Sequence, residues 1–214
     1  MIGIIGGTGS EGTGLAIRLA SIGDEVVIGS RNESKAKIVA NNIRLISDKF
    51  KVHGMSNFSA AQNSEIVIIT VPYKSQKNIL NEIKPNLVNK IVINTVVPMV
   101  FKNSKIFLEN VTDGSASLEA KKLLTDSYVI AAFQTISSQQ LADLENEINS
   151  DVIICGDDLD AKQTVIQLVN RINGLRAIDA GNLNNSIYVE NLTTLLVNIN
   201  KTNKVKSAVR ITGI

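Results

Sequence analysis

Three glycines near the start of the chain stand at the spacing G-x-G-x-x-G, which suits phosphate binding. Gly7, Gly9 and Gly12 follow the apolar run 2–5 and precede an amphipathic stretch that ends at Gly23. Gly7 permits a tight turn, Gly9 lets a pyrophosphate approach the backbone, and Gly12 lets a helix pack close to a strand. The start of that helix would offer free N–H groups to the phosphates. Strand, turn and helix in this order predict a dinucleotide site; a purely structural glycine turn is the alternative.

Glu11 lies inside this motif and carries a charge that does not suit a pyrophosphate. A carboxylate would repel the phosphates, whereas an acid in the first turn of a helix suits the helix dipole. We therefore expect the Glu11 side chain to turn outward.

The end of the second predicted strand, 24–29, indicates which nucleotide is bound. Enzymes that use NAD usually place an acid there for the ribose 2′-hydroxyl. Here the chain continues with Ser30 and Arg31, and Lys35 follows one helical turn later. A guanidinium, a hydroxyl and a second cation suit a 2′-phosphate. The pattern favours NADP over NAD; a solvated basic helix start is the alternative.

Further candidates lie where later apolar strands end. Ligands of open α/β sheets lie beyond the carboxyl ends of the strands. Strand 65–71 ends at Val71, Pro72 and Tyr73, which we expect near the nicotinamide or its ribose, unless they form only a strand-to-helix turn. Strand 127–133 ends in a polar turn that begins with Gln134.

Strands and helices alternate along the chain, which predicts an α/β fold with a Rossmann-type doubly wound parallel sheet. We expect a NADP-binding domain over 1–138 and a small C-terminal α/β lobe over 139–214, which closes the second-cofactor cleft and forms the oligomer interface. The segments that matter below are helices over 34–50, 139–147 and 161–173, an apolar turn at 96–99, and a strand over 151–156.

Composition narrows the class of protein. The chain has 214 residues, 44% hydrophobic content and a net charge of +2, which gives no reason to expect nucleic acid or membrane partners. Cys155 and His53 are the only residues of their types, so we expect no disulfide and no metal site. We expect Cys155 in the core and His53 on the surface. With no signal peptide and no long apolar run, a cytoplasmic protein is expected.

Several segments resemble the archaeal F420-dependent NADP reductases. The similarity covers nearly the whole chain, and its later segments are more specific than the glycine loop. The resembling segments are 6–14, 29–31 with Lys35, 70–72, 96–98, 114–116, 155–158, 174–176, 179–181 and 189–193.

This resemblance implies NADP in the N-terminal domain, coenzyme F420 in the cleft against the C-terminal lobe, and reversible hydride transfer between them. It also implies a homo-oligomer, which we expect to be a dimer. Val97 and Ser138 would lie near the nicotinamide. The NADP contacts implied by the family are Thr8, Gly9, Ser10, Glu11, Ser30, Arg31 and Lys35.

Two departures from the family pattern concern the second ring. Members carry His-Thr-Ile-Pro-Ala where this chain reads 134–138 as Gln-Thr-Ile-Ser-Ser, and a glycine-rich run where this chain reads 201–208. Gln134 can donate a hydrogen bond to a ring carbonyl, so it is our candidate for polarising the acceptor ring. An amide side chain cannot protonate that ring. The alternatives are a NADPH-dependent flavin or ferric reductase and a NADP-sensing protein without turnover.

Overall fold

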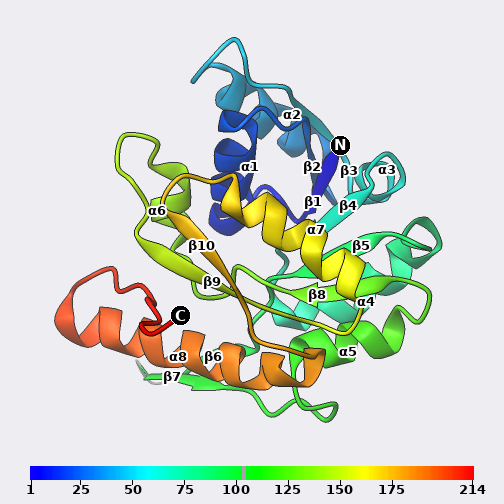
Figure 1. The fold of residues 1–214 in the computed structure, drawn as a ribbon. Helices are drawn as coiled ribbons and strands as arrows, with labels where there is room; N and C mark the ends of the chain where they lie inside the picture. The colour runs from blue at the N-terminus through cyan, green and yellow to red at the C-terminus, as the bar shows by residue number, and fades with distance from the viewer. Residues whose placement is uncertain (103–104) are drawn as a thin grey trace.

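The computed structural model, which describes residues 1–102 and 105–214, is built on one large sheet (Figure 1). Its strands are β1 (Ile2–Ile5), β2 (Val26–Ser30), β3 (Val52–Ser56), β4 (Ile66–Ile69), β5 (Ile91–Asn94), β8 (Tyr128–Ala131), β9 (Ser150–Gly156) and β10 (Leu175–Asp179). They lie in the order β10-β9-β8-β5-β4-β1-β2-β3. Strand β1 pairs in parallel with β2 on one side and with β4 on the other. The chain first adds β2 and β3 on one side of β1 and then crosses to the other side to form β4, so the strand order reverses between β1 and β4.

Helices cover both faces of this sheet. Successive strand residues point to opposite faces, so Ile4 and Ile28 join one core while Ile5 and Val27 join the other. The first face is covered by α1 (Ser10–Ser21), α2 (Glu33–Arg44), α6 (Ser138–Ala142) and α7 (Leu159–Asn170). The second is covered by α3 (Asn57–Gln62), α4 (Tyr73–Ile83), α5 (Ala116–Leu123) and α8 (Ser186–Asn203). The predicted doubly wound α/β fold is confirmed.

The C-terminal part departs from a purely parallel sheet. Strand β9 pairs antiparallel with β8 through only two residue pairs, Ile130 with Gly156 and Ala131 with Cys155. Strand β10 then pairs in parallel with β9. Residues after 138 therefore extend the same sheet with two strands, β9 and β10, which both run opposite to the other strands.

Three predicted elements differ in the structure. Helix α6 stops at Ala142 rather than 147, because the Asp143 side chain accepts hydrogen bonds from the N–H groups of Glu145 and Asn146 and so competes with helix formation. Helix α2 ends at Arg44 rather than 50. The expected apolar turn at 96–99 leads into a hairpin of β6 (Met99–Lys102) and β7 (Lys105–Leu108).

Helix α7 has a side-chain cap, because Asp158 accepts a hydrogen bond from Ala161 N–H at 2.8 Å. The predictions for Cys155 and His53 hold. Cys155 is buried, and burial raises the pKa of its thiol to about 11, so it behaves as a core residue. His53 is exposed and pairs with Glu25. Over the described ranges, no helix has the length and apolar character that a membrane crossing would require.

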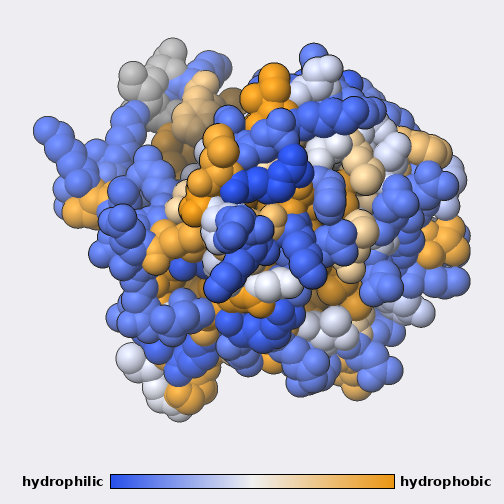
Figure 2. Space-filling model, turned by 90° about the horizontal axis from the view of Figure 1, so that it is seen from above, coloured by the Kyte–Doolittle hydropathy of each residue, from blue (hydrophilic) through white to orange (hydrophobic). Residues whose placement is uncertain are grey.

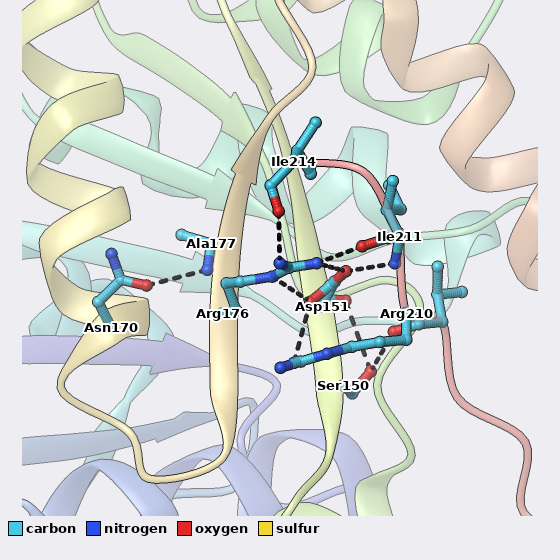
Figure 3. Close-up of polar contacts among 9 residues, drawn as sticks. Ser150, Asp151, Asn170, Arg176, Ala177, Arg210, Ile211 and Ile214 are labelled. Carbon is cyan, nitrogen blue, oxygen red and sulfur yellow. Dashed lines mark hydrogen bonds and ion pairs between the residues drawn. The ribbon is translucent and has the colours of Figure 1, made fainter.

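The end of the chain is fastened to β9 by a buried acid (Figure 3). The Asp151 carboxylate is fully buried and accepts hydrogen bonds from Arg176 at 2.8 and 2.9 Å. Arg210 and the N–H of Ile211 donate to the same carboxylate at 3.1 and 2.6 Å. The Arg176 hydrogen bonds hold the pKa of Asp151 below its usual value. This set of contacts, which we name the Asp151 anchor, fixes residues 209–211 beside the sheet.

Candidate cofactor site

A cleft of about 740 Å³ opens at the carboxyl ends of β1, β2, β4 and β5. Eleven of the twelve predicted site residues line it, although they come from five separate segments of the chain. These are Thr8, Gly9, Ser10, Glu11, Ser30, Arg31, Lys35, Val71, Pro72, Val97 and Gln134. The remaining one, Ser138, lines a smaller adjoining cavity.

The glycine turn has the geometry that close approach of a ligand requires. A Cβ on Gly12 would lie 2.5 Å from the Cα of Gly7, so helix α1 can pack this closely only without a side chain there. A Cβ on Gly9, in contrast, would meet nothing nearer than 3.8 Å. The space over Gly9 is therefore open on the cleft side.

The N-terminus of α1 is left free for an anion. Gly9 at its N-cap provides no side-chain hydrogen bond. The N-termini of α2, α3, α5 and α7 are each capped by a side chain, namely Asn32, Ser56, Ser115 and Asp158. The first N–H groups of a helix lack intrahelical partners, and an uncapped end that faces a cleft suits phosphate oxygens.

Two exposed cations stand at the β2 end of the cleft. Arg31 and Lys35 are both exposed and line it. The buried Ser30 hydroxyl accepts a hydrogen bond from Asn32 N–H at 3.2 Å, and the Asn32 side chain accepts one from Lys35 N–H at 3.0 Å. This corner holds the two cations at the start of α2, where they can pair with a dianionic phosphate.

A second cavity of about 280 Å³ adjoins the first where α6, α8 and the C-terminal segment meet. The two cavities share Glu11, Met99, Gln134 and Thr193. The other residues around the second cavity are Thr135, Ile136, Ser137, Ser138, Leu196, Val197, Asn200 and Ser207.

Buried polar atoms around the second cavity lack partners among the described residues. Gln134 donates from Nε2 to the carbonyl of Asn94 at 2.9 Å, which fixes its amide. Its Oε1, the Thr135 hydroxyl and the Ser207 hydroxyl have no hydrogen-bond partner. Such atoms are normally satisfied, so this group suits a ligand with a polar edge.

Phe133 sets the backbone direction just before Gln134, the residue at which the two cavities meet. It follows β8, is buried, and has a φ of 70°, in the left-handed region that non-glycine residues seldom adopt. Strain of this kind is found where a structure fixes the direction of a functional segment. Here it sets the start of the Gln134 turn.

Two sequence expectations about side-chain direction are wrong. Tyr73 does not line the cleft, because its hydroxyl donates to Glu119 of α5 at 3.0 Å; burial and this contact raise the pKa of Tyr73 to about 12. Glu11 does not turn its carboxyl outward. Its Oε1 is buried without a partner, and burial raises the pKa of Glu11 to about 8.

Other residues at the site were not identified from local pattern. Asn57 is buried and accepts a hydrogen bond from Gly6 N–H at 3.2 Å, so it supports the glycine turn from 51 residues away. Met99 and Thr193 line both cavities. For Thr193 a signal existed, since it lies in the resembling segment 189–193.

Comparisons with known proteins agree with this geometry. A family model described as "NADP oxidoreductase coenzyme F420-dependent" matches residues 1–98. The F420-dependent NADP reductase of Methanothermobacter marburgensis is 38% identical over 100% of this chain and 98% of its own length. The human metalloreductase STEAP2 is 28% identical over 89% of this chain, which spans only 35% of that protein.

A solved structure extends the likeness to the whole fold. A crystal structure of a protein from Arthrobacter sp. FB24 superposes with a TM-score of 0.85 over 99% of both chains, at 22% identity. The archaeal relative matches from end to end, whereas the metalloreductase shares only one part of its length. The chain belongs to the F420-dependent NADP reductase family.

Proposed function

We propose that this protein transfers hydride reversibly between NADP(H) and coenzyme F420. The observation that carries the proposal is the pair of joined cavities at one sheet edge, in a chain 38% identical over its full length to an F420-dependent NADP reductase. Two ring systems could meet where the cavities share their walls. A flavin or ferric reductase, and a sensor without turnover, become outcomes of the test below.

The larger cavity would hold NADP. The free N–H groups of α1 and the open space over Gly9 suit the pyrophosphate, with hydroxyls from Thr8 and Ser10 beside it. Ser30, Arg31 and Lys35 suit the 2′-phosphate. The apolar wall for the nicotinamide would be Val71, Pro72 and Val97.

The smaller cavity would hold the F420 ring, with Gln134 polarising it. Ser138, which the family resemblance implies near the nicotinamide, lines this cavity, so we propose that it lies beside the F420 ring instead. The two cofactors supply the hydride chemistry, and the protein sets their distance and orientation and excludes water. The unpartnered amide and hydroxyl oxygens around this cavity fit the polar edge of a deazaflavin.

On this proposal, residues 1–138 form the NADP-binding domain, and residues 139–214 close the second cavity and provide a homodimer interface. Helix α8 supports both roles. Thr193 and Asn200 face the second cavity, while Tyr188 and Leu195 are 72% and 56% exposed. We place the protein in the cytoplasm.

The test is an anaerobic mixing experiment with NADPH and, in separate cuvettes, F420 or FMN. Loss of the F420 absorbance without loss of the FMN absorbance is expected. Loss of the flavin absorbance alone would move the protein to the flavin reductases. Tight NADPH binding with neither reaction would instead indicate a sensor.

A further inference from the structure

The proposed reaction needs a proton as well as a hydride. When NADPH reduces F420, the hydride leaves C4 of the nicotinamide for C5 of the deazaflavin, and N1 of that ring takes up one proton, which gives NADP⁺ and F420H₂. The inference below therefore rests on the proposed function. It concerns which side chain of this protein holds that proton.

Among the described residues that line the two cavities, Glu11 is the only acid. The other ionisable side chains there are the basic groups of Arg31 and Lys35. The remaining side chains are apolar, hydroxyl or amide groups. His53 and Cys155 lie elsewhere, the first paired with Glu25 and the second in the core.

Glu11 also stands in the right place. It is one of the four residues that line both cavities, so it lies where they meet. The buried Oε1 has no hydrogen-bond partner, which leaves it available to a ligand. An acid in such a position can reach a ring in the smaller cavity and exchange protons with water through the larger one.

Among the described residues that line the smaller cavity, Glu11 is the only charged or ionisable one. Helix α8 presents Thr193, Leu196 and Asn200, and the hairpin presents Met99. The turn 134–138 presents only amide, hydroxyl and apolar groups, and the segment after α8 presents Ser207. Arg31 and Lys35 stand at the β2 end of the larger cavity. Burial is the one cause that shifts the pKa of Glu11, and it raises it, so the carboxyl is mostly neutral at pH 7.

We propose that Glu11 donates the proton that accompanies hydride transfer to F420 and takes it back in the reverse direction. Its neutral form also removes the repulsion that a carboxylate would exert on the neighbouring pyrophosphate. Water at the mouth of the larger cavity returns the proton to Glu11 after each turnover.

The first test needs no cofactor. An acid whose pKa is higher in the folded state than in the unfolded chain lowers stability as pH rises from its unfolded value of 4.5 to about 8. Glu11→Gln cannot titrate, so its melting temperature should rise relative to the wild type as pH increases through this window. Asp160→Asn, which changes an exposed acid in the first turn of α7, should follow the wild type. A constant difference between Glu11→Gln and the wild type would overturn the neutral acid.

The second test measures single-turnover hydride transfer from NADPH to F420 between pH 6 and 9. The wild-type rate should fall as Glu11 ionises, whereas Glu11→Gln should be slower by about 10²-fold or more and independent of pH. NADPH affinity, measured by fluorescence, separates lost binding from lost proton transfer.

Equal rates and pH profiles in the two proteins would overturn the proposal. No transfer to F420 in the wild type would overturn the proposed function, while the melting experiment still decides whether Glu11 is neutral.

Discussion

Arg31 offers the sharpest test at the scale of one residue, because it is exposed at the end of the cleft that we propose for the 2′-phosphate. Arg31→Ala should weaken NADPH binding by about 1.5–3 kcal/mol, the range for hydrogen bonds to charged groups, and leave NADH nearly unchanged. Titration calorimetry with both nucleotides measures this. Lys37→Ala, which removes an exposed cation on α2 paired with Glu33, is the control. Equal losses for both nucleotides would refute the role of Arg31.

Gln134 offers a second test of a single residue. Gln134→Leu removes the hydrogen bond to the Asn94 carbonyl and the free amide oxygen at the cavity junction. One net hydrogen bond contributes about 0.5–1.5 kcal/mol, so the KM for F420 should rise by about 2- to 12-fold. The Kd for NADPH is the internal control. A change in NADPH affinity alone would instead assign Gln134 to the nucleotide half of the site.

The placement of a single residue can be predicted from the sequence when the residues that it contacts lie close to it in the chain. The glycine turn lies within the first strand–helix–strand unit, and Arg31 and Lys35 follow directly after it, so their placement in the cleft could be predicted. The directions of Tyr73 and Glu11 could not, because they depend on distant residues. Glu119 draws Tyr73 toward α5, and α8 with the turn 134–138 lines the cavity that Glu11 faces.

At the scale of elements, the Asp151 anchor links stability to the second cavity. Asp151→Asn leaves Arg176 and Arg210 without their carboxylate. Because these side chains are 34% and 47% exposed, the loss should be that of hydrogen bonds to a charged group, about 1.5–3 kcal/mol. Urea unfolding should show this loss, and the KM for F420 should rise more than that for NADPH, because Ser207 precedes the anchored residues. Asp48→Asn, at an exposed acid, should change neither quantity.

The same anchor predicts a pH dependence. The folded-state pKa of Asp151 lies below its ordinary value of 3.8. Its contribution to stability is therefore complete above pH 3.8 and is lost as pH falls toward the folded-state value. Acid unfolding monitored by circular dichroism should show a smaller pH effect below 3.8 in Asp151→Asn than in the wild type. Identical slopes in the two proteins would contradict this assignment.

The sequence predicted the elements of the N-terminal half better than those after residue 96. Buried parallel strands have continuous apolar runs, and this signal placed β1, β2, β4 and β8. The direction of β9 could not be predicted, because a buried strand has the same apolar content whether it runs parallel or antiparallel to its neighbour. Besides the Asp143 side chain, the early end of α6 involves Arg18, whose guanidinium donates to the carbonyls of Gln140, Leu141 and Asp143, more than 120 residues away in sequence.

At the scale of the whole molecule, exposed hydrophobic side chains bear on oligomerisation. The face in Figure 2 is mostly hydrophilic, with hydrophobic groups in separate small patches. Helix α8, at the bottom of Figure 1, exposes Tyr188, Leu195 and Ile199 at intervals of seven and four residues, which brings them onto one side of the helix. An apolar stripe of this kind is typical of an interface.

Leu195→Lys tests the proposed homodimer. A charge at the centre of that stripe should convert the dimer into a monomer, as measured by light scattering across a range of protein concentrations. Leu45→Lys, at an apolar residue that is 85% exposed at the end of α2, should leave the mass unchanged. A wild-type protein that is monomeric at every concentration would refute the dimer.

The Asp151 anchor also has a consequence for synthesis of the protein. Asp151 is buried on β9, yet Arg210 and Ile211 lie 59 and 60 residues later in the chain. Domains fold as the chain leaves the ribosome, beginning at the N-terminus. The strands from β1 to β8 can therefore assemble while translation continues. The Asp151 carboxylate can pair with Arg176 first, but it gains its last donor only after residue 211 has emerged, so the outer edge of the sheet is completed last.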